Sequence, residues 1–586
     1  MRQARDRAEE TDESPRIGVF VCHCGHNIAG YLDVPALVES ARALPGVVWA
    51  GDSLFTCSDA GLAEIRAAIV QHRLNRVVVA SCTPRTHEPL FQAACEEAGL
   101  NRYLFELVNI RDQCSWVHMN DRELATAKAR DLIRMGVARA ALLEPLSETE
   151  LPVQPEAAII GGGMAGLTAA LSLARRGFAV TLIEREPELG GILRHLDKLY
   201  PTMVDARELV ARRVAEVREQ ANIEVLTSAT VQAVKGYIGH YELTVRSRQF
   251  GLEMDLPVRA GVIIVATGAQ EFKPFGLFGY GDDPRVLTQQ ELERLLAESN
   301  LQSPISNLVM IQCVGARDET HPYCGRICCL TAMKNAMRLK QQNPQTEVYL
   351  LYRDIEVHGT HFEDYYAQAR DLGVIFTRYT PDAPPQVADG RVLVYDELLG
   401  MRLSIPYDLL VLSTPLVPAA GVHELARLLK VPVDEHGFFL EAHVKLRPLD
   451  FATDGIYLCG SAHWPAHLDE AISQALGAAA RATTILSREQ VRSSGAVARV
   501  EESLCRGCER CAQACEFGAI EFVELERAGV LLYRSGPSLS QKIARVNPVL
   551  CKGCGACAVV CPTGALQASH FTSRQVTTMI QAAMGH

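Results

Sequence analysis

The sequence lacks an excess of positive charge. Its 586 residues include 58 Lys and Arg against 69 Asp and Glu, which gives a formal net charge of −11. Because binding to phosphates needs a basic surface, this balance argues against nucleic acid as the main partner. Hydrophobic residues make up 48% and charged residues 22%. This is ordinary for a globular protein and excludes a collagen-like or low-complexity chain.

Long apolar runs are scarce as well. The first residues, MRQARDRAEETDESPR, are charged and contain no apolar stretch typical of a signal peptide. We expect residues 1–15 to form a disordered tail. The longest uncharged run, residues 157–174, contains three consecutive glycines and is therefore a poor membrane span. The sequence predicts a cytoplasmic protein without an integral membrane segment.

Cysteine is the residue type that stands out. Of 19 cysteines, six fall within residues 22–114, four within 313–329 and eight within 505–561, while Cys459 stands alone. Disulfides are a poor explanation in a cytosolic chain of this size. Clustering of this kind predicts metal binding.

Strand and helix patterns divide the chain into several parts. Short β-branched runs and an amphipathic helix predict an α/β domain over residues 16–146. Prolines at 145, 152 and 155 mark a linker. A large α/β region follows over 156–488, and a short polar stretch leads to a cysteine-rich module at 498–570.

The last module carries two cysteine quartets. Both have the spacing C-x2-C-x2-C-x3-C, in which three thiolates hold one cluster and the fourth ligates the other cluster of a pair. Two structural zinc sites are the alternative, although zinc ribbons pair two C-x2-C units across a longer gap. We expect a ferredoxin-like α+β domain with two [4Fe–4S] clusters. The expected ligands are Cys505, Cys508, Cys511, Cys515, Cys551, Cys554, Cys557 and Cys561.

A glycine-rich turn lies between a predicted strand and a predicted helix. Gly161 permits a tight turn, Gly163 lets the backbone approach a pyrophosphate, and Gly166 lets the helix pack on the strand. The next strand ends at Glu184, which can accept the ribose hydroxyls. A glycine turn without a ligand is the alternative. The ordered strand, helix and acidic residue favour a dinucleotide site.

Two later segments favour FAD as the dinucleotide. VIIVATGA and DGIYLCGSA read as strands that run into glycines, and the helix after the second can direct its N-terminus at a flavin ring. This pattern resembles the two-dinucleotide-domain flavoproteins of the thioredoxin reductase type. The resemblance implies an FAD core over 156–488 with a middle lobe at about 285–435. We add Gly191, Thr267, Gly268, Gly460 and Ser461 to the expected cofactor-binding residues.

A second glycine fingerprint, for NAD(P)H, is missing from the sequence. The corresponding strand, NLVMIQ, is followed by CVGAR and then by further cysteines. We infer that a third cluster replaces the nicotinamide beside the flavin, with Cys313, Cys324, Cys328 and Cys329 as its ligands. Buried free thiols or a redox disulfide between Cys328 and Cys329 are the alternatives. The disulfide would suit a stand-alone NAD(P)H-dependent flavin disulfide reductase, and a scaffold with a vestigial flavin site is a third hypothesis.

The N-terminal cysteines allow several interpretations. Cys22, Cys24, Cys57, Cys82 and Cys114 fall at strand ends or in turn-like segments, where they could converge. A cluster, a ligand shared with the Cys313 group and simple packing all remain open. Cys95 lies on a helical pattern and is better explained as a core thiol.

Taken together, these segments resemble the flavin-containing iron–sulfur subunit of heterodisulfide reductase, its A-type subunit. The similarity extends over nearly the whole chain and is carried by VCHCGHNIAG (21–30), VVVASCTPRTHEPLF (77–91), NIRDQCSWVH (109–118), PYCGRICC (322–329) and both quartets. The resemblance implies an oxidoreductase component that relays electrons between FAD and [4Fe–4S] clusters. It implies further reductase subunits and an electron-donating protein, of the hydrogenase or dehydrogenase type, as partners. It also implies a homodimer within a hetero-oligomer.

One departure from the resembled family concerns the number of electron routes. Its longer members carry a C-x-x-C segment and an inserted ferredoxin domain after the first FAD region, whereas residues 190–210 contain no cysteine here. In some complexes of the family the flavin splits electron pairs between two acceptors. Because bifurcation needs two routes, the missing branch weighs against it in this chain.

Overall fold

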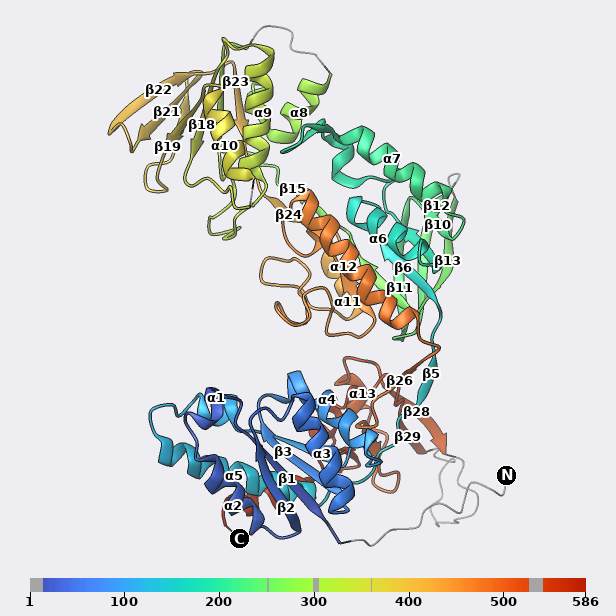
Figure 1. Ribbon diagram of the computed structural model, residues 1–586. Coiled ribbons are helices and arrows are strands. Elements are labelled where there is room, and N and C mark those ends of the chain that lie inside the picture. The colour runs from blue at the N-terminus through green and yellow to red at the C-terminus, as the bar shows by residue number, and fades with distance from the viewer. Residues whose placement is uncertain (1–13, 250–251, 299–304, 360, 526–540, 586) are drawn as a thin grey trace. The chain divides into compact units, whose positions relative to one another are not determined.

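The computed structural model describes residues 14–249, 252–298, 305–359, 361–525 and 541–585 (Figure 1). All but the last two residues of the expected tail, 1–15, lie outside the described residues. The chain divides into two compact units, one formed by residues 1–150 with 492–586 and the other by 151–491. The N-terminal domain and the ferredoxin module thus belong to a single unit.

The N-terminal domain is built on a parallel four-stranded sheet in the order β2-β1-β3-β4. The central strands β1 (Ile17–Cys22) and β3 (Arg76–Ser81) are almost fully buried, as expected for apolar runs covered on both faces. β2 (Val47–Ser53) and β4 (Phe105–Asn109) form the edges. The connecting helices are α2 (Val34–Arg42), α3 (Asp59–Gln71), α4 (Pro84–Glu97) and α5 (Arg122–Ala140).

The ferredoxin module contains two short antiparallel strand pairs. β27 (Ala498–Val500) pairs with β30 (Leu566–Ala568), and β28 (Ile520–Leu525) pairs with β29 (Gln541–Val546). Two one-turn helices, α13 (Arg510–Gln513) and α14 (Ala556–Val559), carry the third cysteine of each quartet. The chain continues past the expected limit of 570 into α15 (Ser573–Ala583), which packs against α5.

Side chains of the N-terminal domain hold the ferredoxin module. Arg139 donates two hydrogen bonds to the carbonyl oxygen of His570, at 3.1 and 2.9 Å, and one of 2.7 Å to the buried carboxylate of Glu106. The Arg139 guanidinium also lies 4.0 Å from the ring centroid of Phe571. These contacts explain why the two segments form one unit although the whole second unit separates them in sequence.

The second unit begins with a parallel five-stranded sheet in the order β10-β7-β6-β14-β25. Reversal of strand order between β6 and β14 creates a crevice at the carboxyl ends of these strands, which is where α/β folds bind dinucleotides. Helices α6 (Met164–Ala174) and α12 (Leu468–Leu486) pack on this sheet. The strands are β6 (Glu156–Ile160), β7 (Ala179–Ile183), β10 (Ile223–Leu226), β14 (Val262–Val265) and β25 (Ile456–Leu458). A three-stranded antiparallel sheet adds β11 (Ala229–Tyr237), β12 (His240–Gln249) and β13 (Leu252–Ala260).

The middle lobe contains a second parallel sheet, in the order β16-β23-β17-β18-β19. Helix α11 (Val422–Leu429) packs against β11 and joins the core of the first sheet, so the lobe ends near residue 412 rather than at the expected 435. Its helices are α8 (Gln289–Ala297), α9 (Cys328–Gln342) and α10 (Phe362–Asp371). Its strands are β16 (Val286–Thr288), β17 (Asn307–Ile311), β18 (Glu347–Tyr352), β19 (Val374–Arg378) and β23 (Leu409–Leu412).

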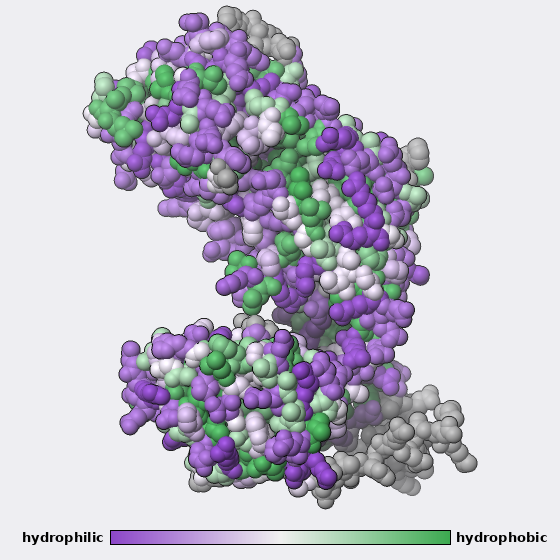
Figure 2. Space-filling view, in the orientation of Figure 1, coloured by the Kyte–Doolittle hydropathy of each residue, from purple (hydrophilic) through white to green (hydrophobic). Residues whose placement is uncertain are grey.

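An apolar patch lies at one end of this lobe, at the turn between β21 (Arg391–Asp396) and β22 (Met401–Pro406). Leu398, Leu399 and Met401 are exposed there. Figure 2 shows apolar surface at this end of the lobe. Contiguous exposed apolar surface of this kind is typical of protein contact sites. Among the described residues, no helix combines the length and the apolar character needed to cross a membrane.

Candidate functional site

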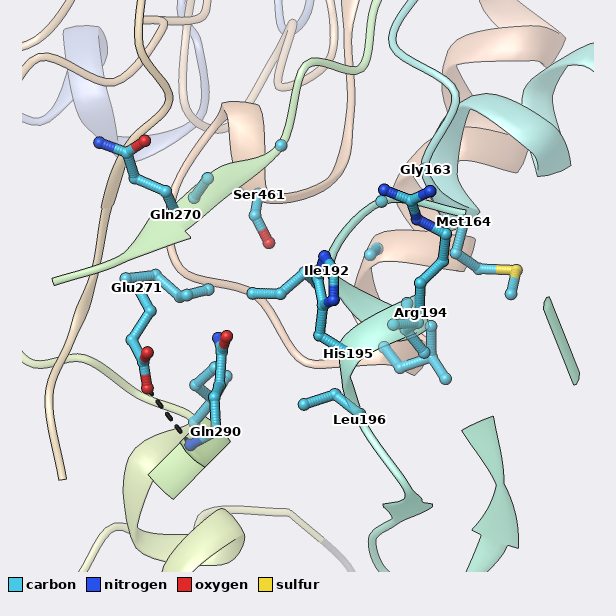
Figure 3. A pocket seen from close by; sticks show the side chains of 18 of the residues that line it. Gly163, Met164, Ile192, Arg194, His195, Leu196, Gln270, Glu271, Gln290 and Ser461 are labelled. Atoms are coloured by element: carbon cyan, nitrogen blue, oxygen red, sulfur yellow. Dashed lines mark hydrogen bonds between the residues drawn. The ribbon is translucent and has the colours of Figure 1, made fainter. Parts of the chain in front are cut away.

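A cavity of about 530 Å³ lies at the carboxyl ends of β6, β7 and β14. Figure 3 shows Gly163 and Met164 on one side of it and Gln270, Glu271 and Gln290 on the other. Seven of the nine residues expected to bind the nucleotide line this cavity, namely Gly161, Gly163, Glu184, Gly191, Thr267, Gly268 and Ser461. The remaining two, Gly166 and Gly460, pack behind its wall against Gly161 and Ala165.

The glycine-rich turn between β6 and α6 has no room for side chains at two of its positions. At Gly161, where φ is +115°, an added Cβ would lie 2.2 Å from the carbonyl oxygen of Ala266. At Gly166 it would lie 1.8 Å from the carbonyl oxygen of Gly161. At Gly163 the nearest atom would be 3.9 Å away, because this position faces the cavity. The turn therefore exposes backbone at the N-terminus of α6, where phosphates bind.

Polar groups in the cavity fit a dinucleotide. Glu184 accepts hydrogen bonds from the backbone N–H groups of Gly162 (2.6 Å) and Glu186 (2.8 Å), which fix its carboxylate at the end of β7. Within the described residues, the buried hydroxyl oxygens of Thr267 and Thr414 have no hydrogen-bond partner, and both residues line the cavity. Buried hydroxyl groups need a hydrogen-bond partner, and a bound nucleotide would supply one.

The sequence analysis missed a charged part of the cavity wall. Lys334 on α9 and Glu293 on α8 both line the cavity, and their side chains are 1% and 0% exposed. Lys334 donates a hydrogen bond to Glu293 and another, of 2.7 Å, to the carbonyl oxygen of Lys198. Burial lowers the pKa of Lys334, and the Glu293 carboxylate opposes this shift. The pair places one positive and one negative charge side by side in the cavity wall.

Cys328 connects the cavity with the cysteines after β17. It is the first residue of α9 and is buried in the cavity wall, whereas Cys313, Cys324 and Cys329 lie outside the lining. The four thiols lie close enough for their charges to affect one another. Burial, with added effects from Cys329 and Cys324, raises the pKa of Cys313 to about 11. A hydrogen bond from Cys328 lowers the pKa of Cys329.

The backbone around these cysteines directs an N–H group at a sulfur atom and contains two residues in the left-handed conformation. The amide of Arg326 donates a hydrogen bond of 3.3 Å to the Cys324 sulfur, and Cys313 and Arg326 both have positive φ. N–H···S bonds stabilise thiolates and tune iron–sulfur clusters. Among the described residues, no three His, Cys, Asp or Glu side chains are drawn together as a ready metal-ion site, and this holds for the ferredoxin quartets too.

The ferredoxin module brings Cys515 to the second quartet. Cys515 shares a small cavity with Cys551, Cys554 and Cys557, and its charge raises the pKa of Cys557, after burial and Cys551, to about 11. The sulfurs of Cys505, Cys515 and Cys551 accept N–H bonds of 3.3–3.4 Å from Ala544, Ala519 and Ala498. The position of Cys515 beside the second quartet is what the exchange of fourth ligands in a two-cluster ferredoxin would require of this residue.

Four of the five N-terminal cysteines for which the sequence allows several interpretations lie together in the structure. Cys22 ends β1, Cys24 follows it, Cys82 follows β3 and Cys57 follows β2. The pKa of Cys57 is raised by burial and by Cys22 and Cys24. Burial also raises the pKa of Cys82, which Cys24 and Cys22 affect as well. Arg111 lies 3.8 Å from the Cys24 sulfur.

Cys114 and Cys95 are not part of this group. The Cys114 thiol donates a hydrogen bond of 3.0 Å to the carbonyl oxygen of Ala125, and Lys128 is the charged group that affects it. Cys95 is fully buried in α4, and burial raises its pKa to about 12. Both behave as packing thiols.

Two family models match parts of the chain. A model described as pyridine nucleotide-disulphide oxidoreductase matches residues 155–309, which contain the glycine-rich turn. A model described as 4Fe-4S dicluster domain matches residues 504–565, which contain both quartets. The chain therefore combines an α/β region of the pyridine nucleotide-disulphide oxidoreductase type with a C-terminal domain of the 4Fe-4S dicluster type.

Curated relatives match over most of the sequence. The A-type subunit of the H(2):CoB-CoM heterodisulfide,ferredoxin reductase of Methanothermobacter thermautotrophicus is 37% identical, with 89% of this chain and 93% of the relative covered. The second A-type iron-sulfur subunit of the CoB–CoM heterodisulfide reductase of Methanopyrus kandleri is 36% identical, with 88% and 92% covered.

Among solved structures, thioredoxin reductases align with part of this chain. The enzyme of T. acidophilum aligns with a TM-score of 0.40 at 15% identity and covers 56% of this chain and 99% of its own. That of Lactococcus lactis aligns with a TM-score of 0.40 at 19% identity and covers 57% and 99%.

Proposed function

Because this chain belongs to the family of A-type, iron–sulfur subunits of heterodisulfide reductase, we propose that it relays electrons between one FAD and [4Fe–4S] clusters held by its own cysteines. The observation that carries the proposal is the position of Cys328, which lines the same cavity as Gly161, Glu184 and Thr267. A cluster ligand at this position would bring iron–sulfur chemistry to the wall of the flavin site. The protein is an oxidoreductase with an electron-transfer role.

FAD would supply two-electron chemistry and the clusters one-electron steps, so that together they would couple two-electron transfer to one-electron transfer. The residues described above divide the work of holding FAD. The turn at Gly161 and Gly163 would take the pyrophosphate, Glu184 would accept the ribose hydroxyls, and Thr267 and Ser461 would contact the remainder, since all five residues line the cavity. The N-terminus of α12 borders the cavity through Leu468 and Ala471, and its backbone dipole would favour a reduced, anionic flavin, although Asp469 and Glu470 in the first turn oppose this effect.

We assign the clusters to three groups of cysteines. The ferredoxin quartets hold two, with Cys515 and Cys561 exchanged between them. Cys313, Cys324, Cys328 and Cys329 hold one beside FAD. We also assign one to Cys22, Cys24, Cys57 and Cys82, which is supported by the cationic Arg111 at Cys24 and by N–H bonds to the Cys22 sulfur of 3.3 and 3.5 Å.

The relay is proposed to be linear. Between Gly191 and β10 the chain passes through a short 3₁₀ turn (Gly191–His195), two short strands and α7 (Ala206–Glu219), and none of these residues is a cysteine. A second branch from the flavin, which electron bifurcation needs, has no ligands in this segment. Partner subunits would take up or supply the electrons. A homodimer, a hydrogenase- or dehydrogenase-type donor and a cytoplasmic location stay predictions.

Anaerobic purification tests the cofactors. We expect one FAD and, with four clusters of four irons, about sixteen irons per chain. Cys324→Ser should lose about four irons and keep FAD. Cys459→Ser, at a buried thiol outside all three groups, is the matched control and should lose none. Fewer than about eight irons would refute the paired ferredoxin clusters.

The kind of electron donor that reduces the flavin tests the proposed relay against the alternative reductase. A one-electron donor, such as a reduced viologen dye, should bleach the flavin of the intact protein. NAD(P)H alone should not bleach it. Rapid bleaching by NAD(P)H would instead support the stand-alone flavin disulfide reductase.

A further inference from the structure

A chain of three titratable side chains leads from the surface to the nucleotide cavity. His358 is 53% exposed, and its ring centroid lies 5.6 Å from that of His467. His467 is 5% exposed, and its Nδ1 lies 3.0 Å from the hydroxyl oxygen of Tyr200. Tyr200 lines the cavity that contains the glycine-rich turn and Cys328.

Among the described residues, the second ring nitrogen of His467 has no hydrogen-bond partner, which indicates a role for this residue beyond packing. Its Nε2 is buried, yet within the described part of the chain no group forms a hydrogen bond with it. Buried polar atoms are rarely left in this condition without a function. Two aromatic contacts fix the ring, since Phe362 and Tyr200 lie 5.4 and 5.8 Å from it between centroids. His467 is therefore oriented toward Tyr200 through one nitrogen and has the other available for a proton.

The electrostatic surroundings keep His467 neutral and Tyr200 protonated. Burial lowers the pKa of His467, and the positive charges of Arg326 and His358 act in the same direction, while Asp469 and Glu470 oppose it. Burial raises the pKa of Tyr200, and negative charge at Asp469 and Glu293 adds to this shift. A neutral imidazole beside a protonated phenol can accept a proton at one nitrogen and release one at the other.

The proposed function creates a need for such a route. Hydride transfer from a nicotinamide would bring a proton together with two electrons, whereas iron–sulfur clusters deliver electrons alone. We propose that His358, His467 and Tyr200 conduct the proton that flavin reduction consumes, an inference that rests on the proposed electron relay. For each electron pair delivered to the flavin, His467 would pass one proton through the Tyr200 hydroxyl into the cavity. His358, whose ring lies 5.6 Å from that of His467 without a direct hydrogen bond among the described residues, would replace this proton from solvent through a bridging water.

Three variants test the route. Tyr200→Phe and His467→Gln should each slow single-turnover reduction of the bound flavin by about 100-fold. Their FAD affinity, iron content and flavin midpoint potential should match those of the unaltered protein, because a relay changes the rate and not the equilibrium. The matched control is Tyr365→Phe, since Tyr365 is a buried tyrosine of the same unit outside the cavity lining, and it should reduce normally.

A second measurement does not require any cofactor. In FAD-free protein with ¹⁵N-labelled histidine, Tyr200→Phe should shift the His467 Nδ1 resonance and leave that of His463 in place. Normal flavin reduction in both relay variants would overturn the proposal, and so would an unmoved His467 resonance. If the flavin of the unaltered protein cannot be reduced by a one-electron donor, the proposed function fails instead.

Discussion

Lys334 and Glu293 form an ion pair inside the wall of the nucleotide cavity, where neither side chain is more than 1% exposed. The pair is anchored at both ends, because Lys334 also binds the carbonyl oxygen of Lys198 and Glu293 accepts the N–H of Asp197 at 3.0 Å. The ion pair thus joins helices α8 and α9 to the backbone at residues 197 and 198. Breaking a buried pair leaves an uncompensated charge, which costs more than the pair itself contributes.

We predict that Lys334→Met lowers the free energy of unfolding of the second unit by about 3–5 kcal/mol. The double variant Lys334→Met with Glu293→Gln should lose less, because no isolated charge remains. Trp464 is the one tryptophan of residues 151–491, so its fluorescence in a Trp49→Phe, Trp116→Phe background reports on this unit during denaturant unfolding. A loss below about 1 kcal/mol for the single variant would show that water reaches and solvates the remaining Glu293 carboxylate.

Two glycines of the same turn should respond differently to alanine. Gly163→Ala should fold with near-normal stability and lose FAD, because its Cβ points into the cavity with no atom closer than 3.9 Å. Gly166→Ala should destabilise the unit whether or not FAD is present, because its Cβ meets a carbonyl oxygen at 1.8 Å. Thermal unfolding of both variants, combined with FAD titration, separates the two effects. Normal FAD binding by Gly163→Ala would contradict the assignment of the phosphate site.

The parts of the site that depend on local spacing could be predicted from the sequence. The turn at Gly161 and the cysteine quartets are such cases, since each packs its chemistry into a short stretch of chain. Tyr200 and Lys334 could not be predicted, because they reach the cavity only through the packing of the middle lobe. One signal was available for Lys334, which is the single charge in the run CCLTAMKNAM on a buried helix.

For the N-terminal cysteines too, only part of the arrangement could be predicted from the sequence. Strand ends at one edge of a parallel sheet predict that Cys22 and Cys82 converge, and the structure brings them together with Cys24 and Cys57. The direction of the Cys114 side chain, which sits in a π-helical turn and bonds to Ala125, cannot be deduced from its position in sequence.

Cys515 should belong to the cluster of the second quartet. We predict that Cys515→Ser and Cys551→Ser perturb the same EPR signal, because the structure places both residues around one small cavity. Cys561→Ser should perturb the other signal, together with Cys505→Ser. Reduced samples of the four variants, compared at equal iron content, give the grouping directly. If Cys515→Ser instead alters the signal that responds to Cys505→Ser, the fourth ligands are not exchanged.

Glu106 should make the first unit less stable as the pH rises. Burial raises its pKa from 4.5 to about 7, and the pairing with Arg139 at 2.7 Å offsets only part of this shift. The folded protein then binds a proton more tightly than the unfolded chain does, so stability is greatest below about pH 4.5 for this group and falls between about pH 4.5 and 7. Glu106→Gln should flatten this slope, while Glu97→Gln, at an exposed position in α4, should keep it. The measurement is the denaturation midpoint of the first unit, followed through Trp49, from about pH 5 to 8. A slope that survives in Glu106→Gln would assign the titration to another group.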